Sequence, residues 1–212
     1  RASGARIVLS TVAVNLRDCP PFGSLANSNL LATDQAQFHS LYARAISLQT
    51  NQQPAQAAEH FAQAAQLDST FAELHFRWAQ CLLAATNLAA AREHFQQACD
   101  VDALPFRADT RINGAIRSLA NNLTAGDVIF CDAEAALMAA STNGIAGDES
   151  FFEHVHFNFD GNYRLARVWA ESIARALPEA GQRNATAAWA SQETCERAFG
   201  LSDWNRMFVY SS

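Results

Sequence analysis

The sequence contains no lysine. All 15 basic side chains are arginines, set against 21 acidic side chains, and the net charge is −6. The arginines are spread along the chain and form no basic cluster. Nucleic acids and anionic membrane surfaces are bound through such clusters, so we expect neither as a partner. No apolar run approaches the ~18 residues that a membrane span requires, and we expect no membrane span in this chain.

Paired cysteines are also lacking. The five cysteines are scattered and form no C-x-x-C pair, which argues against a disulfide framework or a zinc site. We expect buried free thiols, no metal and no cofactor. Unpaired thiols favour a bacterial cytoplasm. The chain begins at Arg1 rather than at Met, so we expect a fragment or a processed product, and its compartment and oligomeric state stay open.

A repeat is the clearest feature that the sequence does contain. Shifting the chain by 34 positions aligns ten identical pairs, the first members of which lie between residues 45 and 68. The pairs are Ala45/Ala79, Leu48/Leu82, Ala55/Ala89, Ala57/Ala91, Glu59/Glu93, His60/His94, Phe61/Phe95, Gln63/Gln97, Ala64/Ala98 and Asp68/Asp102. This period is that of the tetratricopeptide repeat, a helix–turn–helix unit. The chain resembles two such repeats followed by a closing helix at about residues 105–121.

The repeated positions suit packed helix pairs. Ala45 and Ala79 fall where two helices must approach closely. Ala57, Phe61 and Ala64 have the i, i+4, i+7 spacing of one helix face, and the second copy repeats them. The sequence therefore predicts a mainly helical protein.

The resemblance implies a concave face built by the first helix of each pair. The candidate partner contacts on it are Tyr42, Ile46, Phe76, Gln80, Leu83, Arg107 and Arg117. Only the last two are cationic, so a basic clamp for a peptide carboxylate is missing. The apolar members suggest that the face docks against another part of this protein, and a separate protein or peptide ligand is the alternative. We interpret the repeated His60 and His94 as solvated or cap-type side chains.

The segments on either side of the repeats predict an interrupted α/β domain. Residues 6–14 and 127–132 are apolar runs typical of buried strands. Strands separated by helical segments favour a parallel sheet. We therefore predict that residues 1–33 and 123–212 are pieces of one partial α/β domain. Residues 34–122 are then tetratricopeptide-like helical hairpins inserted between its two strands.

A loop after the second predicted strand carries the main candidate for chemistry. Glu153 lies three residues before His156, and Gly161 follows five residues later, where a helix is expected. This arrangement is similar to the last motif of the SGNH (GDSL-type) hydrolases, Asp-x-x-His, with glutamate in place of the usual aspartate. The resemblance implies that the partial α/β domain is flavodoxin-like, that His156 is the general base for a serine nucleophile and that Glu153 orients it. The alternatives are a structural loop histidine and a metal pair of His154 with His156, which lacks a third ligand.

The other SGNH motifs are not found in the chain. The Gly-Asp-Ser nucleophile motif, the oxyanion-hole glycine and the Gly-x-Asn-Asp motif are expected to precede residue 1. The first hypothesis is a fragment of a tetratricopeptide-containing SGNH-like hydrolase that acts in ester hydrolysis or acyl transfer. It would be inactive alone, with the repeats as an interaction or docking module and the absent N-terminal part of its own domain as a partner. The second is a non-catalytic repeat scaffold for protein–protein interaction.

Overall fold

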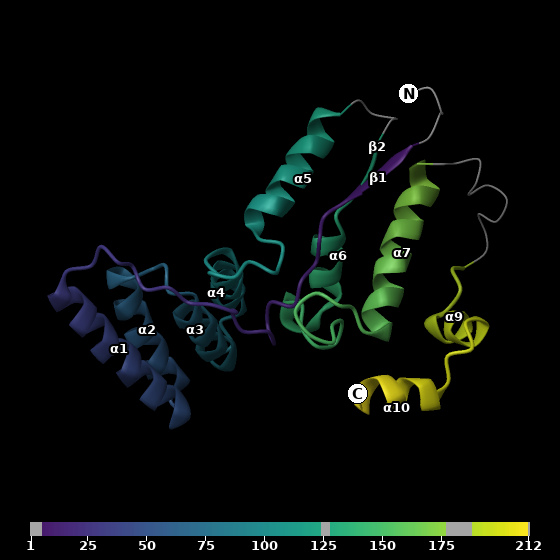
Figure 1. Ribbon diagram of the computed structural model, residues 1–212. Coiled ribbons are helices and arrows are strands. Elements are labelled where there is room, and N and C mark those ends of the chain that lie inside the picture. The colour runs from purple at the N-terminus through teal and green to yellow at the C-terminus, as the bar shows by residue number, and fades with distance from the viewer. Residues whose placement is uncertain (1–5, 124–127, 177–187, 212) are drawn as a thin grey trace.

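The computed structural model describes residues 6–123, 128–176 and 188–211. Over these residues the protein is mainly helical, with one two-stranded parallel sheet (Figure 1). The strands are β1 (Ile7–Ser10) and β2 (Val128–Cys131). The helices between them are α1 (Ala32–Thr50), α2 (Pro54–Leu67), α3 (Ala72–Ala84), α4 (Leu88–Asp100) and α5 (Thr110–Asn122). The helices after β2 are α6 (Ala133–Ala140), the 3-10 turn η1 (Thr142–Gly144), α7 (Phe159–Ala176), α9 (Gln192–Ala198) and α10 (Asp203–Ser211).

The first four helices form two hairpins, α1 with α2 and α3 with α4 (Figure 1). The turns of the two hairpins have the same geometry 34 residues apart. Gln52 and Thr86 both lie in the left-handed region, with φ of 58° and 61°. The residue after each of them donates its N–H to a leucine carbonyl five positions earlier, at 2.9 Å in both turns. This pattern is the Schellman motif that ends a helix, so the period of the sequence is also a period of the backbone.

Each hairpin buries the face that the repeated positions predict. Ala45 and Ala79 are fully buried, where α1 and α3 pack closely against their neighbours. Phe61 and Phe95, 34 residues apart, are the buried rings of α2 and α4. The first ring belongs to a core shared by α1, α2 and α3, and the second to a core between α3 and α4. The hairpins are therefore held together by burial of small and aromatic side chains in alternation.

The extended segment between β1 and α1 runs across the second hairpin. Val14 and Leu16 join the core that Phe76 and Phe95 form. The strand expected over residues 6–14 is accordingly shorter than its apolar run. Its pairing with β2 ends at Ser10, because the apolar side chains that follow are buried against helices instead of in the sheet.

The two strands pair in register, with Ile7 opposite Val128 and Ser10 opposite Cys131. In Figure 1 the strands lie between α5 on one side and α7 on the other. α7 packs on β2 and α5 on β1. Ile7 and Phe130 nevertheless keep exposed side chains, although their apolar runs predict cover on both faces. Among the described helices, none has the length and apolar character to cross a membrane.

α5 connects the hairpins to the sheet. It begins at Thr110, later than the expected residue 105, because Asp109 caps it by accepting a hydrogen bond from the Ile112 N–H at 3.0 Å. The side chain of Asn113 is fully buried and exchanges two hydrogen bonds with the backbone of Val12, at 2.8 and 2.9 Å. α5 therefore covers β1, and Asn113 fastens α5 to the segment that follows β1.

Candidate functional site

Glu153 and His156 are in direct contact, as their spacing predicts. The Glu153 carboxylate Oε1 accepts the backbone N–H of His156 at 2.8 Å and also contacts the ring Nδ1 of the same histidine. Because Nδ1 is hydrogen-bonded to the carboxylate, Nε2 is the ring nitrogen that is left for proton exchange. The His156 side chain is 78% exposed. The Glu153 carboxylate therefore holds the ring of an exposed histidine at the protein surface.

The carboxylate of Glu153 also organises the rest of its loop. Its Oε2 accepts the backbone N–H of His154 at 2.8 Å and contacts the His154 ring. The loop is closed by a bridge between Phe151 and Phe157. It is attached to the segment after β1, since the Asn15 N–H donates to the His154 carbonyl at 3.0 Å. Glu153 is therefore fixed by several contacts and does not depend on His156 alone.

Gly161, in the first turn of α7, is buried at a place where no side chain fits. A Cβ at this position would lie 2.0 Å from the carbonyl oxygen of Ser150. The Gly161 N–H donates to the side-chain oxygen of Asn158 at 2.9 Å, and the side-chain amide of Asn158 donates to the carbonyl of Asp148 at 2.8 Å. The glycine that the sequence motif contains is thus what lets α7 pack against the start of the histidine loop.

Arg107 is not on an exposed face, and its assignment as a partner contact is corrected. It precedes α5 and is only 3% exposed. Its guanidinium pairs with Asp102 at 3.3 Å and donates to the carbonyls of Asn15 and Cys19 at 2.9 and 2.7 Å. The helix expected to carry it begins three residues later. Arg107 therefore ties the hairpins to the segment after β1.

Arg117 is likewise engaged within the protein. It donates to both oxygens of Asp132 at 2.9 and 2.8 Å and contacts Glu134 at 2.6 Å. These acids stand at the junction of β2 and α6, so Arg117 ties α5 to the end of the sheet. Its side chain is 37% exposed and also lines a groove between α4 and α6. The hydrogen bond from Arg117 is the main cause that lowers the pKa of the Asp132 carboxyl. The expected role of Arg117 in partner binding stays a prediction.

Of the remaining five predicted face residues, one is buried, three are partly buried and one is exposed. Phe76 is buried in the core of the second hairpin and Leu83 packs against it. Tyr42 and Ile46 pack on the core of the first hairpin, and burial raises the pKa of Tyr42 to about 12. Gln80 alone among these five is exposed. Phe76 shares its core with Val14 and Leu16, so the segment after β1 covers its ring.

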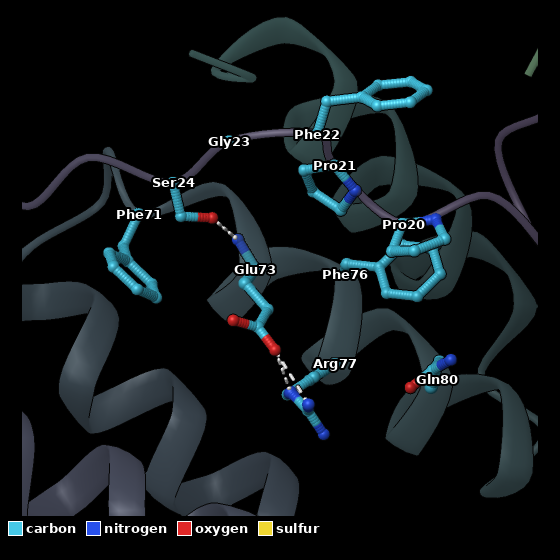
Figure 2. A pocket seen from close by; sticks show the side chains of 10 residues that line it. All are labelled: Pro20, Pro21, Phe22, Gly23, Ser24, Phe71, Glu73, Phe76, Arg77 and Gln80. Carbon is cyan, nitrogen blue, oxygen red and sulfur yellow. Dashed lines mark hydrogen bonds and ion pairs between the residues drawn. The ribbon is translucent and has the colours of Figure 1, made fainter. Parts of the chain in front are cut away.

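A groove of about 650 Å³ lies where the segment 20–24 crosses α3 (Figure 2). Glu73 and Arg77 form an ion pair on its floor, at 2.7 Å. The Ser24 hydroxyl accepts the Glu73 N–H at 2.8 Å, which fastens the crossing segment to the start of α3. Gln80 lines the same groove. The chain itself thus covers part of the predicted face and leaves a groove of mixed polar and apolar lining beside it.

His94 is not solvated, which corrects its interpretation. Its ring stacks on Trp78, with 3.7 Å between centroids, and its Nδ1 lies 3.2 Å from that of His75. Burial, with a smaller contribution from His75, lowers the pKa of His94 to about 4. Burial also lowers the pKa of His75, although the Ser69 carbonyl opposes the shift. Both rings are therefore neutral at pH 7 and act as packing groups.

All five cysteines are free thiols, and Cys81, Cys99 and Cys131 are buried. Burial raises the pKa of Cys99 to about 12 and that of Cys81 to about 11. In the part of the chain that the structure describes, no three His, Cys, Asp or Glu side chains gather as metal ligands.

Phe22 and Phe106 lie beside the histidine loop, although no sequence motif marks them. The ring of Phe22 is 5.0 Å from that of His154, and Phe106 is 6.4 Å from it. The contacts join segments far apart in the sequence, so only the fold brings them together.

A scan against protein-family models, a search of curated proteins and a search of solved structures each give no match to this chain.

Proposed function

We propose that this chain is the part of an SGNH-like serine hydrolase that supplies the general base, His156, and its orienting acid, Glu153. The observation that carries the proposal is the contact of the Glu153 carboxylate with Nδ1 of an exposed histidine. Gly161 adds support, because the same motif places it where α7 meets the loop. The hairpins of α1 to α4 are then tetratricopeptide-like repeats inserted between β1 and β2.

The proposed chemistry is ester hydrolysis or acyl transfer through a serine acyl-enzyme. Nε2 of His156 accepts the proton of the serine hydroxyl as its oxygen attacks the ester carbonyl, and returns that proton to the leaving alcohol. Glu153 stabilises the imidazolium that forms between these two transfers. In this proposal the serine belongs to a part of the protein other than these 212 residues, and the chain is inactive alone.

Determining the coding sequence upstream of Arg1 and assaying the extended protein on a short-chain p-nitrophenyl ester tests the proposal. His156→Ala should lower kcat by about 10²–10⁴-fold, the usual contribution of a positioned general base. Glu153→Gln should also lower kcat, and Glu153→Asp should restore much of it, because a carboxylate is again present. His39→Ala removes an exposed histidine of α1 and serves as the control. Full activity of His156→Ala contradicts the proposal.

The groove of Figure 2 supports a second candidate, a repeat scaffold that binds a protein partner. Its floor offers the Glu73–Arg77 pair and Gln80 to the backbone of an extended peptide. Gln80→Ala and Arg77→Ala should weaken binding of such a partner, whereas His156→Ala should leave it unchanged. Phe76→Ala does not separate the two functions, since its ring is buried and its loss destabilises the hairpin.

A further inference from the structure

Two phenylalanines form an exposed aromatic pair next to the histidine loop. Phe22 comes from the segment between β1 and α1, and Phe106 from the connection between α4 and α5. They are 42% and 64% exposed. Their rings meet edge to face, with 5.3 Å between centroids. The chain of contacts continues from Phe22 to the His154 ring at 5.0 Å, and from His154 to the His156 ring at 6.0 Å.

The backbone beneath this pair is fixed by a buried ion pair. The Asp102 carboxylate accepts the N–H groups of Phe22 and Gly23, both at 2.9 Å. Its partner Arg107 follows Phe106 directly and donates to the Cys19 carbonyl at 2.7 Å. The side chains of Asp102 and Arg107 are each only 2% exposed. Both aromatic residues are therefore held in place before any ligand arrives, which reduces the entropy lost on binding.

We infer that Phe22 and Phe106 form the wall of the site that receives the apolar, C–H-rich part of the substrate. The inference rests on the proposed function, since it takes His156 as the reacting centre. Phenylalanine rings offer a large apolar surface and no hydrogen-bonding group. The part of a ligand that they accept is therefore an acyl chain or the C–H face of a sugar ring. These sources share one chemistry.

The same geometry gives the helical insertion a part in substrate recognition. Phe106 belongs to the chain between α4 and α5, and Phe22 is held by Asp102 at the end of the second hairpin. The hairpins thus deliver one wall of the site and position the other. Changes at these two residues should alter which substrate is bound and leave the Glu153–His156 pair intact.

Binding of inert probes to the 212-residue chain tests this inference. Hexanamide represents the acyl chain and methyl α-D-glucopyranoside the sugar ring, and neither contains an ester. The ring C–H resonances of His154 report binding by NMR, since its ring lies against Phe22 and Phe106. Those of His156 report it through the contact between the two histidine rings. At least one probe should shift them in a saturable way, and the probe that does so identifies the source.

Phe22→Ala and Phe106→Ala should each weaken that binding by about fivefold or more, because a stacking surface is lost. Phe199→Ala removes a more exposed phenylalanine at the end of α9 and should not change it. Phe22→Ser and Phe106→Ser remove both the ring and the apolar surface, and replace any alanine variant that fails to fold. Absence of binding by both probes, or equal binding by Phe106→Ala or its serine replacement, overturns the inference.

This outcome is separate from that of the proposed function. Probe binding that depends on the two rings, together with an extended protein in which His156→Ala keeps full activity, retains the aromatic site and rejects the hydrolase. Loss of activity in His156→Ala with probe binding that ignores the rings does the reverse.

Discussion

Asp68 and Asp102, 34 residues apart, hold the same extended segment of the chain against the two helical hairpins. Asp68 accepts the Asn27 N–H at 2.8 Å, and Asp102 accepts the N–H groups of Phe22 and Gly23 at 2.9 Å. Each carboxylate also accepts an N–H two residues further along its own loop, at 2.8 and 3.0 Å. Both aspartates are buried. Their identity in the repeat therefore has a structural cause, since each hairpin uses the same acid to fasten the crossing segment.

Asp102→Asn is expected to destabilise the protein by about 3–5 kcal/mol, the usual cost of removing one partner of a buried ion pair. The loss arises because Arg107 stays buried without its counter-charge. Asp68→Asn should cost less, since no buried ion pair is broken. Urea unfolding measures both, with Glu93→Gln on the exposed face of α4 as the control. An Asp102→Asn variant as stable as that control contradicts the assignment of Arg107 to an internal clamp.

Gly161→Ala is expected to disturb the histidine loop. The added methyl would meet the Ser150 carbonyl oxygen at 2.0 Å, so α7 or the loop must move. Gly114→Ala is the matched control, because a Cβ at that position in α5 has no atom within 4 Å. The control should be stabilising by about 0.5–1 kcal/mol, the usual gain from replacing glycine inside a helix. Thermal unfolding compares the two, and equal effects would show that the close approach at Gly161 is not required.

The stability of the second hairpin should depend on pH through its buried histidines. The folded pKa of His94 is lowered to about 4 from an ordinary value of 6.5, chiefly by burial, and that of His75 is lowered as well. Between pH 6.5 and about 4 the unfolded chain therefore binds more protons than the folded chain. Stability is complete above pH 6.5 and falls as the pH decreases from 6.5 towards 4. Asp68 faces His75. Burial raises the pKa of the Asp68 carboxyl, but the hydrogen bonds that the carboxylate accepts outweigh burial, so its net pKa is lowered. The stability that Asp68 contributes is therefore lost at a lower pH.

Urea midpoints at pH 8, 6.5 and 5 test this dependence. His94→Gln should lose less stability between pH 6.5 and 5, because one of the two histidines that take up a proton only in the unfolded chain has been removed. A midpoint that stays constant over this range in the unaltered protein would contradict the burial of the pair. If His94→Gln loses as much stability as the unaltered protein, the pH dependence comes from other groups.

Local patterns in the sequence were sufficient for some features and not for others. The positions of Ala45 and Ala79 follow from a period read along the chain, and the Glu153–His156 contact joins residues three apart. Extending that period into a third helix predicts Arg107 on an exposed face, whereas the residue is buried. Its partners include the carbonyl of Asn15, 92 residues earlier, and no local pattern specifies such a contact. The Phe22–Phe106 pair was not found for the same reason.

The two hairpin turns offer a last prediction from the repeat. Thr86 has a φ of 61°, where a β-branched side chain is strained, and Gln52 has a φ of 58° at the same point of the first hairpin. Thr86→Gly should stabilise the protein by about 0.5–1 kcal/mol, because glycine relieves that strain. Part of the gain is lost, since glycine gives the unfolded chain more conformational freedom. Gln52→Gly should stabilise it less, since glutamine is not branched at Cβ.

Ala85→Gly is the control for these turn variants, because Ala85 precedes the strained position with an ordinary φ of −85°. Glycine there should destabilise the protein by about 0.5–1 kcal/mol through chain entropy alone. Urea unfolding of the three variants gives the signs directly. If Thr86→Gly and Ala85→Gly change stability in the same direction, the left-handed conformation at Thr86 does not hold in solution, and the two turns do not share one geometry.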